Sequence, residues 1–310
     1  MKIKYEQRLN QKLEIITEST LVVGVDIAKN VQWARTVDYR GIEIGKAIRF
    51  TNDKQGFEEI VSTIHDRCKQ KGYTKVIVGM EPTGHYWKPL ANYLQKQETV
   101  TVVLVNPYAT KMSKELDDNS PTKSDKKDSL TIARLVKDGR YYELYIPHDV
   151  YADLRVMSST RQSLNKRKHA LKNTIVAVMD EYFPEFITVF KHPFKGKAAR
   201  HILKTFPFPK YILELSEDEV TQEIKSSVKK TVGRKHARKL IAAAQESIGV
   251  DYGEEAARFK LKGLMDELDL VERQIEELES RMAETLNEIS YTKYLLSVKG
   301  IGVITLAALL

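Results

Sequence analysis

Residues 21–27 have the sequence Leu-Val-Val-Gly-Val-Asp-Ile, a β-branched run that predicts a buried strand with an acid, Asp26, close to its end. An alternating segment at 31–38 follows, and after the turn residues Asp38-Tyr-Arg-Gly41 comes a third strand segment at 42–50. Short turns between successive strands favour antiparallel pairing. We therefore expect a meander of three strands.

Downstream of the meander, helical and strand patterns alternate. Residues 54–71 have apolar side chains at helical spacing, 75–80 and 99–105 are further strand segments, and helices are expected around 86–97 and from Ser124 onward. A meander that leads into crossover units makes a mixed sheet. This is the element order of the ribonuclease H-like fold. The predicted class is an α/β N-terminal domain, with a mixed sheet and helices on both of its faces.

From Val150 onward the chain has helical patterns only. One long helix is predicted to end at Phe183-Pro184. A later segment keeps apolar residues at alternating three- and four-residue intervals over about four heptads, which predicts a coiled coil. Its stripe consists of Leu261, Leu264, Leu268, Val271, Ile275, Leu278, Met282 and Ile289. The partner of this stripe is either a second subunit or another helix of the chain.

Composition limits the possible cofactors and the location. The chain has 310 residues, 42% of them hydrophobic, and one cysteine, which excludes an internal disulfide and a multi-cysteine zinc site. The histidines lack ligand spacing, so carboxylates would have to hold any metal, which favours Mg²⁺ or Mn²⁺. No run of about 18 apolar residues is present, so no membrane partner is expected. The polar N-terminus lacks the apolar stretch of a signal peptide, which predicts a cytoplasmic location.

Charge is segregated along the sequence. The net charge is +8 and the sequence pI is about 9.2. Residues 155–240 contain 19 Lys and Arg against 8 Asp and Glu, whereas residues 241–290 contain 5 against 13. A basic block of this kind indicates a polyanionic partner.

Four acids from distant parts of the sequence are candidates for one site: Asp26 in the first strand, Glu81 directly after the fourth, and Asp125 and Asp128 at the start of a helix. In the predicted sheet the first two can be neighbours, and residues three apart share one helix face. Carboxylates that close repel one another unless cations lie between them. Two Mg²⁺ ions are the usual solution, and such a pair suits in-line displacement at phosphorus.

Each acid also has an interpretation without function. Asp26 could end a strand, and Glu81-Pro82 could be a strand-to-turn junction. Asp125 and Asp128 follow Ser124 in the first turn of a helix, where acids favour capping and the helix dipole. The joint placement of all four acids favours a metal site.

Four motifs resemble those of the DEDD transposases of bacterial insertion sequences, which are bridge-RNA-guided recombinases with a RuvC-like N-terminal domain. The motifs are Gly24-Val-Asp26-Ile-Ala-Lys29, Met80-Glu81-Pro-Thr-Gly84-His-Tyr-Trp87, Val105-Asn-Pro107 and Lys123-Ser-Asp125-Lys-Lys-Asp128-Ser-Leu-Thr-Ile-Ala-Arg134. The resemblance continues through Asp153-Leu-Arg155 and Arg161 to Gly300-Ile-Gly302 and covers nearly the whole chain.

This resemblance implies that Asp26, Glu81, Asp125 and Asp128 are catalytic and bind metal, with two Mg²⁺ or Mn²⁺ ions as the cofactor. It places Lys29, Lys123 and Arg134 beside the site, near nucleic-acid phosphates. It also implies donor and target DNA, a structured guide RNA, a bacterial cytoplasmic location, and homodimers or homotetramers.

In the family, a serine of the C-terminal domain attacks phosphorus and forms a phosphoserine–DNA intermediate. The sequence ends at Leu310, before the segment where that serine would lie. Ser297 does not match the position of the nucleophile, so no serine is assigned. We therefore expect a truncated chain that does not complete strand exchange alone.

The basic block supplies further candidates for nucleic-acid binding, because clustered cations neutralise phosphates. These are Arg155, Arg161, Lys166, Arg167, Lys168, Lys172, Arg234, Lys235, Arg238 and Lys239. Interleaved aromatic residues, among them Tyr182, Phe183 and Phe208, could stack on bases, but aromatic side chains more often form a core.

The predicted organisation has an N-terminal extension at 1–20 and a RuvC-like catalytic domain at 21–148. A basic helical region at 149–250, a coiled coil at 251–290 and the start of a C-terminal transposase domain at 291–310 come after it.

Three alternatives to the recombinase remain. A hydrolytic resolvase or nuclease of the same fold would use water in place of serine, and a non-catalytic scaffold would only bind RNA or DNA. An actin-like or sugar-kinase ATPase also opens with a Gly-x-Asp strand. However, Ala28-Lys29 replace the small residues that cradle phosphate in such proteins, and no second Asp-x-Gly strand motif follows.

Overall fold

The computed structural model describes residues 2–117, 125–227 and 233–310, without the side chains of residues 2–5, 8, 114–117, 125–126 and 227. It contains two compact units, Met1–Tyr145 and Ile146–Leu310. We call the first the sheet unit and the second the helical unit. The finer division of the helical part, at 149–250, 251–290 and 291–310, stays a prediction.

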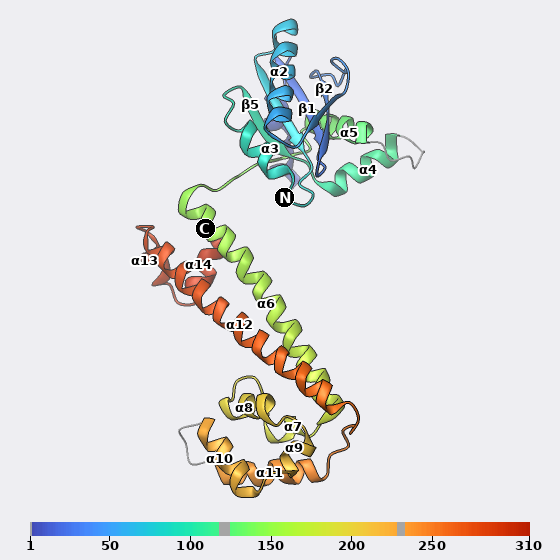
Figure 1. The fold of residues 1–310 in the computed structure, drawn as a ribbon. Helices are drawn as coiled ribbons and strands as arrows, with labels where there is room; N and C mark the ends of the chain where they lie inside the picture. Colours follow the sequence, from blue (N-terminus) through green and yellow to red (C-terminus); the bar gives the residue numbers. More distant parts are fainter. Residues whose placement is uncertain (1, 118–124, 228–232) are drawn as a thin grey trace. The chain divides into compact units, whose positions relative to one another are not determined.

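The sheet unit contains a mixed six-stranded sheet in the order β3-β2-β1-β4-β5-β6 (Figure 1). Its strands are β1 (Thr20–Asp26), β2 (Val31–Val37), β3 (Ile48–Thr51), β4 (Lys75–Met80), β5 (Val100–Leu104) and β6 (Tyr142–Glu143). β1, β4 and β5 are parallel, and the other pairs are antiparallel. The predicted mixed sheet and its ribonuclease H-like element order are confirmed.

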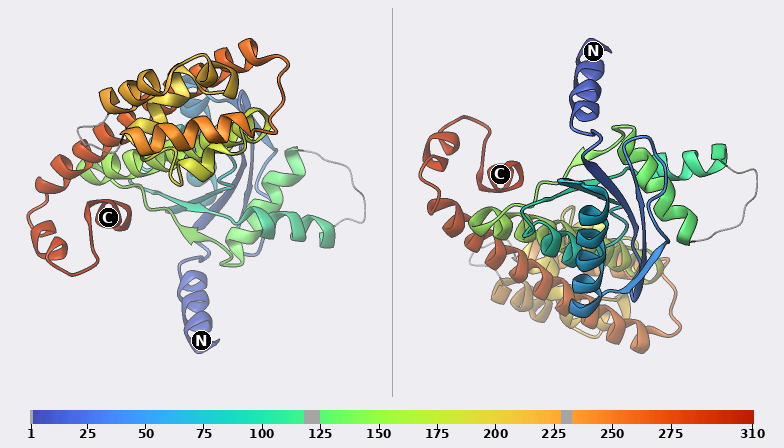
Figure 2. Two further views of the ribbon diagram at one scale, coloured as in Figure 1. Left: turned by 90° about the horizontal axis from the view of Figure 1, so that it is seen from below. Right: turned by 90° about the horizontal axis from the view of Figure 1, so that it is seen from above.

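Helices cover both faces of this sheet (Figure 2). The helices of this unit are α1 (Lys2–Glu14), α2 (Lys54–Lys71), α3 (Trp87–Leu94), α4 (Pro107–Asp117) and α5 (Asp125–Lys137). Of these, α1 extends away from the sheet in Figure 2, and α4 packs on α5. The side chain of Asp53 accepts a hydrogen bond from the backbone N–H of Gly56, which caps α2. α5 packs on the face that includes Gly24 and Gly79, and α2 and α3 pack on the opposite face.

The helical unit is built on two long helices, α6 (Asp149–Tyr182) and α12 (Glu254–Asn287), which lie side by side in Figure 1. Between them in sequence lie α7 (Phe186–Val189), α8 (Lys197–Thr205), α9 (Pro209–Leu213), α10 (Glu217–Ser227) and α11 (Gly233–Gln245). α13 (Thr292–Leu296) and α14 (Val303–Leu309) come last. The helical region after the sheet is therefore confirmed.

The predicted apolar stripe of α12 packs within the chain. Leu261, Leu268, Val271 and Ile275 are buried in one core with residues of α6 such as Leu171 and Ile175. Met282 packs in a second core with Leu154 of α6. Of the two partners left open by the sequence, another helix of the same chain covers this stripe.

The sequence predicts no helix that spans a membrane. Within the described ranges, no helix combines the length and the apolar character that crossing a bilayer requires.

Candidate active site at the ends of the central strands

Two of the predicted acids lie side by side at the end of the sheet where the parallel strands finish. Asp26 is the last residue of β1, and Glu81 directly follows β4. The parallel register pairs Gly24 with Gly79 and Val25 with Met80, so its next step pairs Asp26 with Glu81. Neighbouring strands lie about 4.8 Å apart, and residues paired in this way point to the same face. Both side chains are half-buried.

Helix α5 approaches this face unusually closely at Gly24. A Cβ atom at Gly24 would lie 2.1 Å from the carbonyl oxygen of Ser129 and 2.3 Å from the backbone nitrogen of Ala133. Only glycine permits this approach of helix and strand backbones. Gly24 is two residues before Asp26, on the same face of the sheet. The first turns of α5 are thereby held against the strand that ends at Asp26.

The other two predicted acids belong to this part of α5. Asp128 is half-buried and directly precedes Ser129, the residue whose carbonyl oxygen meets Gly24. Asp125 is the first residue of α5, and its side chain lies outside the described residues. Three of the four acids are thus placed around one contact between β1, β4 and α5. The backbone of the fourth begins the same helix.

Thr83 fixes the orientation of Glu81. Its hydroxyl donates a hydrogen bond of 2.6 Å to Oε1 of Glu81, and its backbone N–H donates one of 2.8 Å to the Glu81 carbonyl oxygen. Gly84, at φ +64°, continues the turn in a conformation that favours glycine. Sequence reasoning missed this role. The signal available was a threonine two residues after the acid, followed by glycine.

The donor atoms at this edge fit a hard divalent cation. Asp26, Glu81 and Asp128 offer carboxylate oxygens, the ligands that Mg²⁺ and Mn²⁺ prefer. Among the side chains that the structure describes, which include Asp26, Glu81 and Asp128, no group of three or more His, Cys, Asp or Glu is close enough together to hold a metal ion. The structure therefore does not bring these three carboxylates together around one ion. The Asp125 carboxylate is not among those side chains.

Three predicted cations belong to the sheet unit. Lys29 is exposed between β1 and β2, and its carbonyl oxygen accepts a hydrogen bond of 3.2 Å from Nδ2 of Asn52. Arg134 is exposed on α5, next to Ala133. Lys123 lies outside the described residues.

Comparison with known proteins identifies the family. The model for the DEDD transposases of the IS110 type, described as "Transposase", matches residues 23–184, more than half of the 310 residues. The chain belongs to this family. The match includes Asp26, Glu81, Asp125 and Asp128.

One relative of this transposase chain is described as "Mini-circle putative transposase for IS117" and comes from Streptomyces coelicolor. It is 22% identical over 290 residues, which are 91% of this chain and 69% of the relative.

Two solved structures have some likeness to the chain. The first is described as "T. thermophilus RuvC in complex with Holliday junction substrate", at 17% identity and a TM-score of 0.27, covering 40% of this chain and 99% of that one. The second is an Aquifex aeolicus member of the Ppx/GppA family, at 10% identity and a TM-score of 0.21, covering 83% and 98%. TM-scores this low support no conclusion about this transposase.

In the helical unit of the transposase, several predicted nucleic-acid-binding cations already pair with acids. Arg161 pairs with Glu279 at 2.6 Å, Arg167 with Glu267 at 2.7 Å, and Lys172 with Glu272 at 2.9 Å. On α11, Arg234 pairs with Asp218 at 2.7 Å and Arg238 with Glu217 at 2.8 Å. The basic and acidic blocks of the sequence therefore neutralise each other in part.

The remaining predicted cations of this unit are Arg155, Lys166, Lys168, Lys235 and Lys239. All are exposed except Lys168, which is half-buried. Sequence reasoning missed the pairing of the other five. For Arg161, Arg167 and Lys172 the signal was the acidic surplus at 241–290, which balances much of the basic surplus at 155–240. Arg234 and Arg238 pair instead with Asp218 and Glu217, which belong to the basic block itself.

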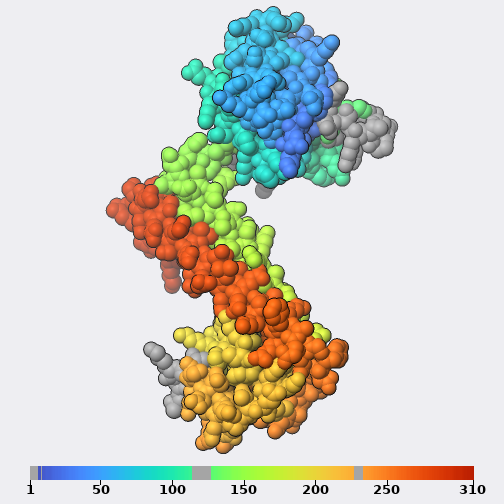
Figure 3. All heavy atoms as spheres, in the orientation of Figure 1, coloured from blue at the N-terminus to red at the C-terminus, as the bar shows by residue number. Residues whose placement is uncertain are grey.

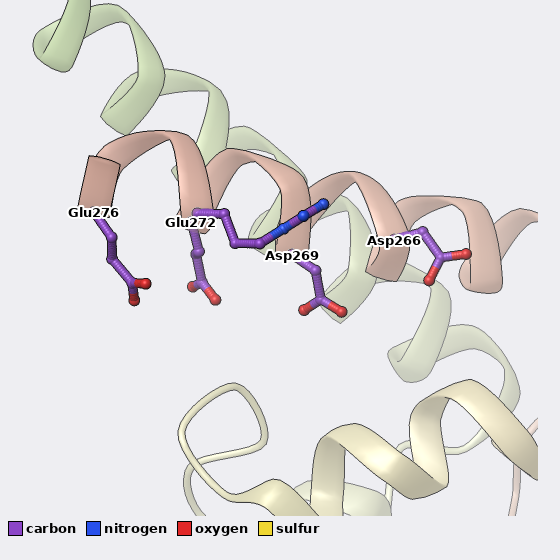
Figure 4. Close-up of a pocket in the computed structure, with 5 residues that line it drawn as sticks. Asp266, Asp269, Glu272 and Glu276 are labelled. Carbon is purple, nitrogen blue, oxygen red and sulfur yellow. The ribbon is translucent and has the colours of Figure 1, made fainter. Parts of the chain in front are cut away.

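The acids of α12 also line an open pocket in the helical unit (Figure 4). Its lining residues are Asp266, Asp269, Glu272, Arg273 and Glu276. Arg200 donates hydrogen bonds to Asp269 and Glu272, and Lys204 donates to Asp266 and Asp269. Burial by itself raises the pKa of Asp269, but the hydrogen bonds from Lys204 and Arg200 outweigh it and lower that pKa below its ordinary value.

The aromatic residues of the basic block form a core, as their residue type favours. Phe183, Phe186 and Phe208 are fully buried, and the rings of Tyr182 and Phe208 stack at 4.9 Å. These side chains are not available to stack on bases.

Proposed function

We propose that the chain acts on DNA by metal-dependent phosphoryl transfer, as an RNA-guided transposase. Asp26, Glu81, Asp125 and Asp128 would hold two Mg²⁺ or Mn²⁺ ions. The single observation that supports this best is the register of β1 and β4, in which Asp26 and Glu81 are neighbours on one face of the sheet. Like charges held side by side are costly unless a cation lies between them.

The bound ions would stabilise the charge that develops on the phosphoryl oxygens during in-line displacement. The residues of the chain orient the ligands. Thr83 holds one oxygen of the Glu81 carboxylate, so that the other can face Asp26. The amino end of α5, which begins at Asp125, adds a positive helix dipole that favours carboxylates there.

RNA guidance, a serine nucleophile and a homodimer or homotetramer remain parts of this proposal that rest on the family resemblance. No serine of this chain is assigned as the nucleophile. The predicted coiled-coil contact between subunits would need a surface of α12 other than the stripe that packs on α6, because that stripe is buried within the chain.

A direct test is to purify the chain from a bacterial host and sequence the RNA that accompanies it. A discrete RNA of one length would support guidance, and the absence of RNA at low salt would contradict it. In parallel, cleavage of DNA should require Mg²⁺ or Mn²⁺ and stop in EDTA.

A hydrolytic nuclease of the same fold is the second candidate, because the same acids would serve a water nucleophile. A denaturing gel separates the two, after labelled DNA has reacted with a full-length form that carries the serine of the family's C-terminal domain. A covalent protein–DNA adduct supports the serine mechanism, whereas cleavage without an adduct supports hydrolysis. A non-catalytic scaffold would give neither product.

A further inference from the structure

Helix α6 has an unusual charge composition. From Leu154 to Met179 it contains no aspartate or glutamate, and it contains six lysines and arginines. A solvent-exposed helix normally mixes both signs, as α12 does with Arg273, Glu277 and Arg281 on its exposed side. The absence of acids over 26 residues of α6 therefore needs a specific reason.

The cations on one flank of α6 are explained by ion pairs with acids of α12. Arg161, Arg167 and Lys172 pair with Glu279, Glu267 and Glu272. Arg161 and Lys172 are half-buried in these contacts. Their charges stabilise the helix pair, and releasing them to bind a ligand would leave acids of α12 without partners.

The opposite flank is not explained by the fold. Arg155 and Lys166 are exposed and, within the described residues, form no ion pair. Ser159, Gln162, Ser163 and Asn173 are exposed at the three- and four-residue spacing that places them on the same side of the helix. From Arg155 to Asn173 this side is about 27 Å long. We call these six residues the outer face of α6, and part of α6 is visible at the surface in Figure 3.

The residue types of the outer face match those that contact a nucleic-acid backbone. Arginine, lysine, serine, asparagine and glutamine side chains form most protein contacts to DNA phosphates. Single strands are bound on aromatic side chains that stack with bases. The sequence from Ala152 to Glu181 contains no Phe, Tyr or Trp.

We propose that the outer face of α6 binds the phosphate backbone of double-stranded DNA, and that Arg161, Arg167 and Lys172 do not contact it. This narrows the set of cations that the sequence predicts, and it rests on the proposed function in DNA transposition. The length of the face corresponds to about eight base pairs at 3.4 Å each.

The test uses the full chain and a fluorescent 30-base-pair duplex in EDTA, with affinity measured at several salt concentrations. The double variant Arg155→Gln/Lys166→Gln should bind the duplex about tenfold more weakly. The slope of log K against log salt should fall by about 1.8, since each phosphate contact contributes about 0.9. The matched control Arg273→Gln/Arg281→Gln removes the same charge from exposed positions of α12 and should change the affinity less than about twofold.

Equal losses in both double variants would show a general charge effect and overturn the proposal. So would an unchanged affinity in the first variant, or a loss for a single-stranded RNA of the same length without a loss for the duplex. Circular dichroism spectra establish that each variant is folded. Duplex binding is measured in EDTA and without cleavage, so failure of the acid site and failure of the outer face give different results.

Discussion

The two units of the molecule arrange their carboxylates in opposite ways. In the sheet unit, Asp26 and Glu81 are neighbours on adjacent strands, so like charges lie side by side. In the helical unit, acids of α12 such as Glu272 and Asp269 each face cations from α6 or α8. The first arrangement places acids on adjacent strands, where a cation could bind between them, and the second pairs each acid with a cation of the chain, which adds stability.

This comparison shows that a cluster of acidic residues in a sequence does not by itself indicate a ligand-binding site. The 241–290 segment is far more acidic than any part of the sheet unit, yet its acids have structural partners. The sheet unit contributes only two such acids here, Asp26 and Glu81, but the register of β1 and β4 places them on adjacent strands. The neighbours of an acid, and not the number of acids, indicate whether it serves the fold or a ligand.

The largest effect is expected at the acid pair. Asp26→Asn should lower metal-dependent DNA cleavage by at least about a thousandfold, because stabilisation of the transition state by a metal ion is worth several kcal/mol. Circular dichroism spectra and the free energy of unfolding in EDTA establish that the variant is folded.

The control for this prediction is Glu277→Gln on the exposed side of α12, which should leave cleavage unchanged. Cleavage that survives in Asp26→Asn would show that Asp26 is not part of the catalytic site. A marked loss of stability in that variant would mean that Asp26 serves the fold.

The next largest effect is expected where α5 meets β1. Gly24→Ala places a methyl group 2.1 Å from the carbonyl oxygen of Ser129, so helix and strand must separate. We expect a loss of about 3 kcal/mol or more in the free energy of unfolding, together with lost cleavage as Asp128 moves. Trp33 and Trp87 are the only tryptophans and both belong to the sheet unit, so their fluorescence follows its unfolding. An unfolding transition that is unchanged from that of the parent, as followed by this fluorescence, would show that α5 does not pack as described.

Much of the sheet could be predicted from the sequence. The helix at 54–71 and the strand at 75–80 occur with the predicted bounds, because long periodic segments have clear patterns. The third strand is shorter than the predicted 42–50. Glycines 41 and 45 adopt positive φ and leave only a single bridge at Glu43 before Ile48–Thr51. β6 has two residues, too few for any pattern.

The site could be predicted only in part. The neighbourhood of Asp26 and Glu81 follows from crossover topology, which a sequence pattern can indicate. The ion pairs of Arg161, Arg167 and Lys172 could not be predicted, because they depend on the register of two helices about 100 residues apart in the chain. The hydrogen bond from Thr83 to Glu81 could not be predicted either, because it depends on a turn geometry that sequence spacing alone does not determine.

A smaller effect on stability is expected when the pH is lowered, and it concerns the paired acidic residues of the helical unit. Burial raises the pKa of Glu272, but the hydrogen bonds from Lys172 and Arg200 outweigh it and lower that pKa, as they do for Asp269. An acid whose pKa is lowered by folding stabilises the fold at pH values above its ordinary pKa, which is 3.8 for aspartate and 4.5 for glutamate. That stability is lost as the pH falls through the lower folded-state values.

The variant Asp269→Asn/Glu272→Gln should therefore be less stable than the parent at pH 7, by about 1 kcal/mol for each partly exposed pair. The difference should shrink as the pH falls below the ordinary values of 3.8 and 4.5, and disappear once the pH is below the lowered folded-state values. Far-ultraviolet circular dichroism follows this unfolding, since the helical unit contains most of the helix. A difference that persists unchanged at acid pH would mean that packing, and not charge, is responsible.

The smallest effect is expected at Gly263, and it has the opposite sign to that at Gly24. Gly263 lies in the middle of α12 with no atom within 4 Å of the position of a Cβ, so alanine meets no obstacle there. Gly263→Ala should raise the free energy of unfolding by up to about 1 kcal/mol, because alanine restricts the unfolded chain and favours helix. Denaturant unfolding followed by circular dichroism at two protein concentrations measures this gain. A loss of stability that grows with concentration would contradict the prediction, and it would indicate that this side of α12 lies against a second copy of the chain.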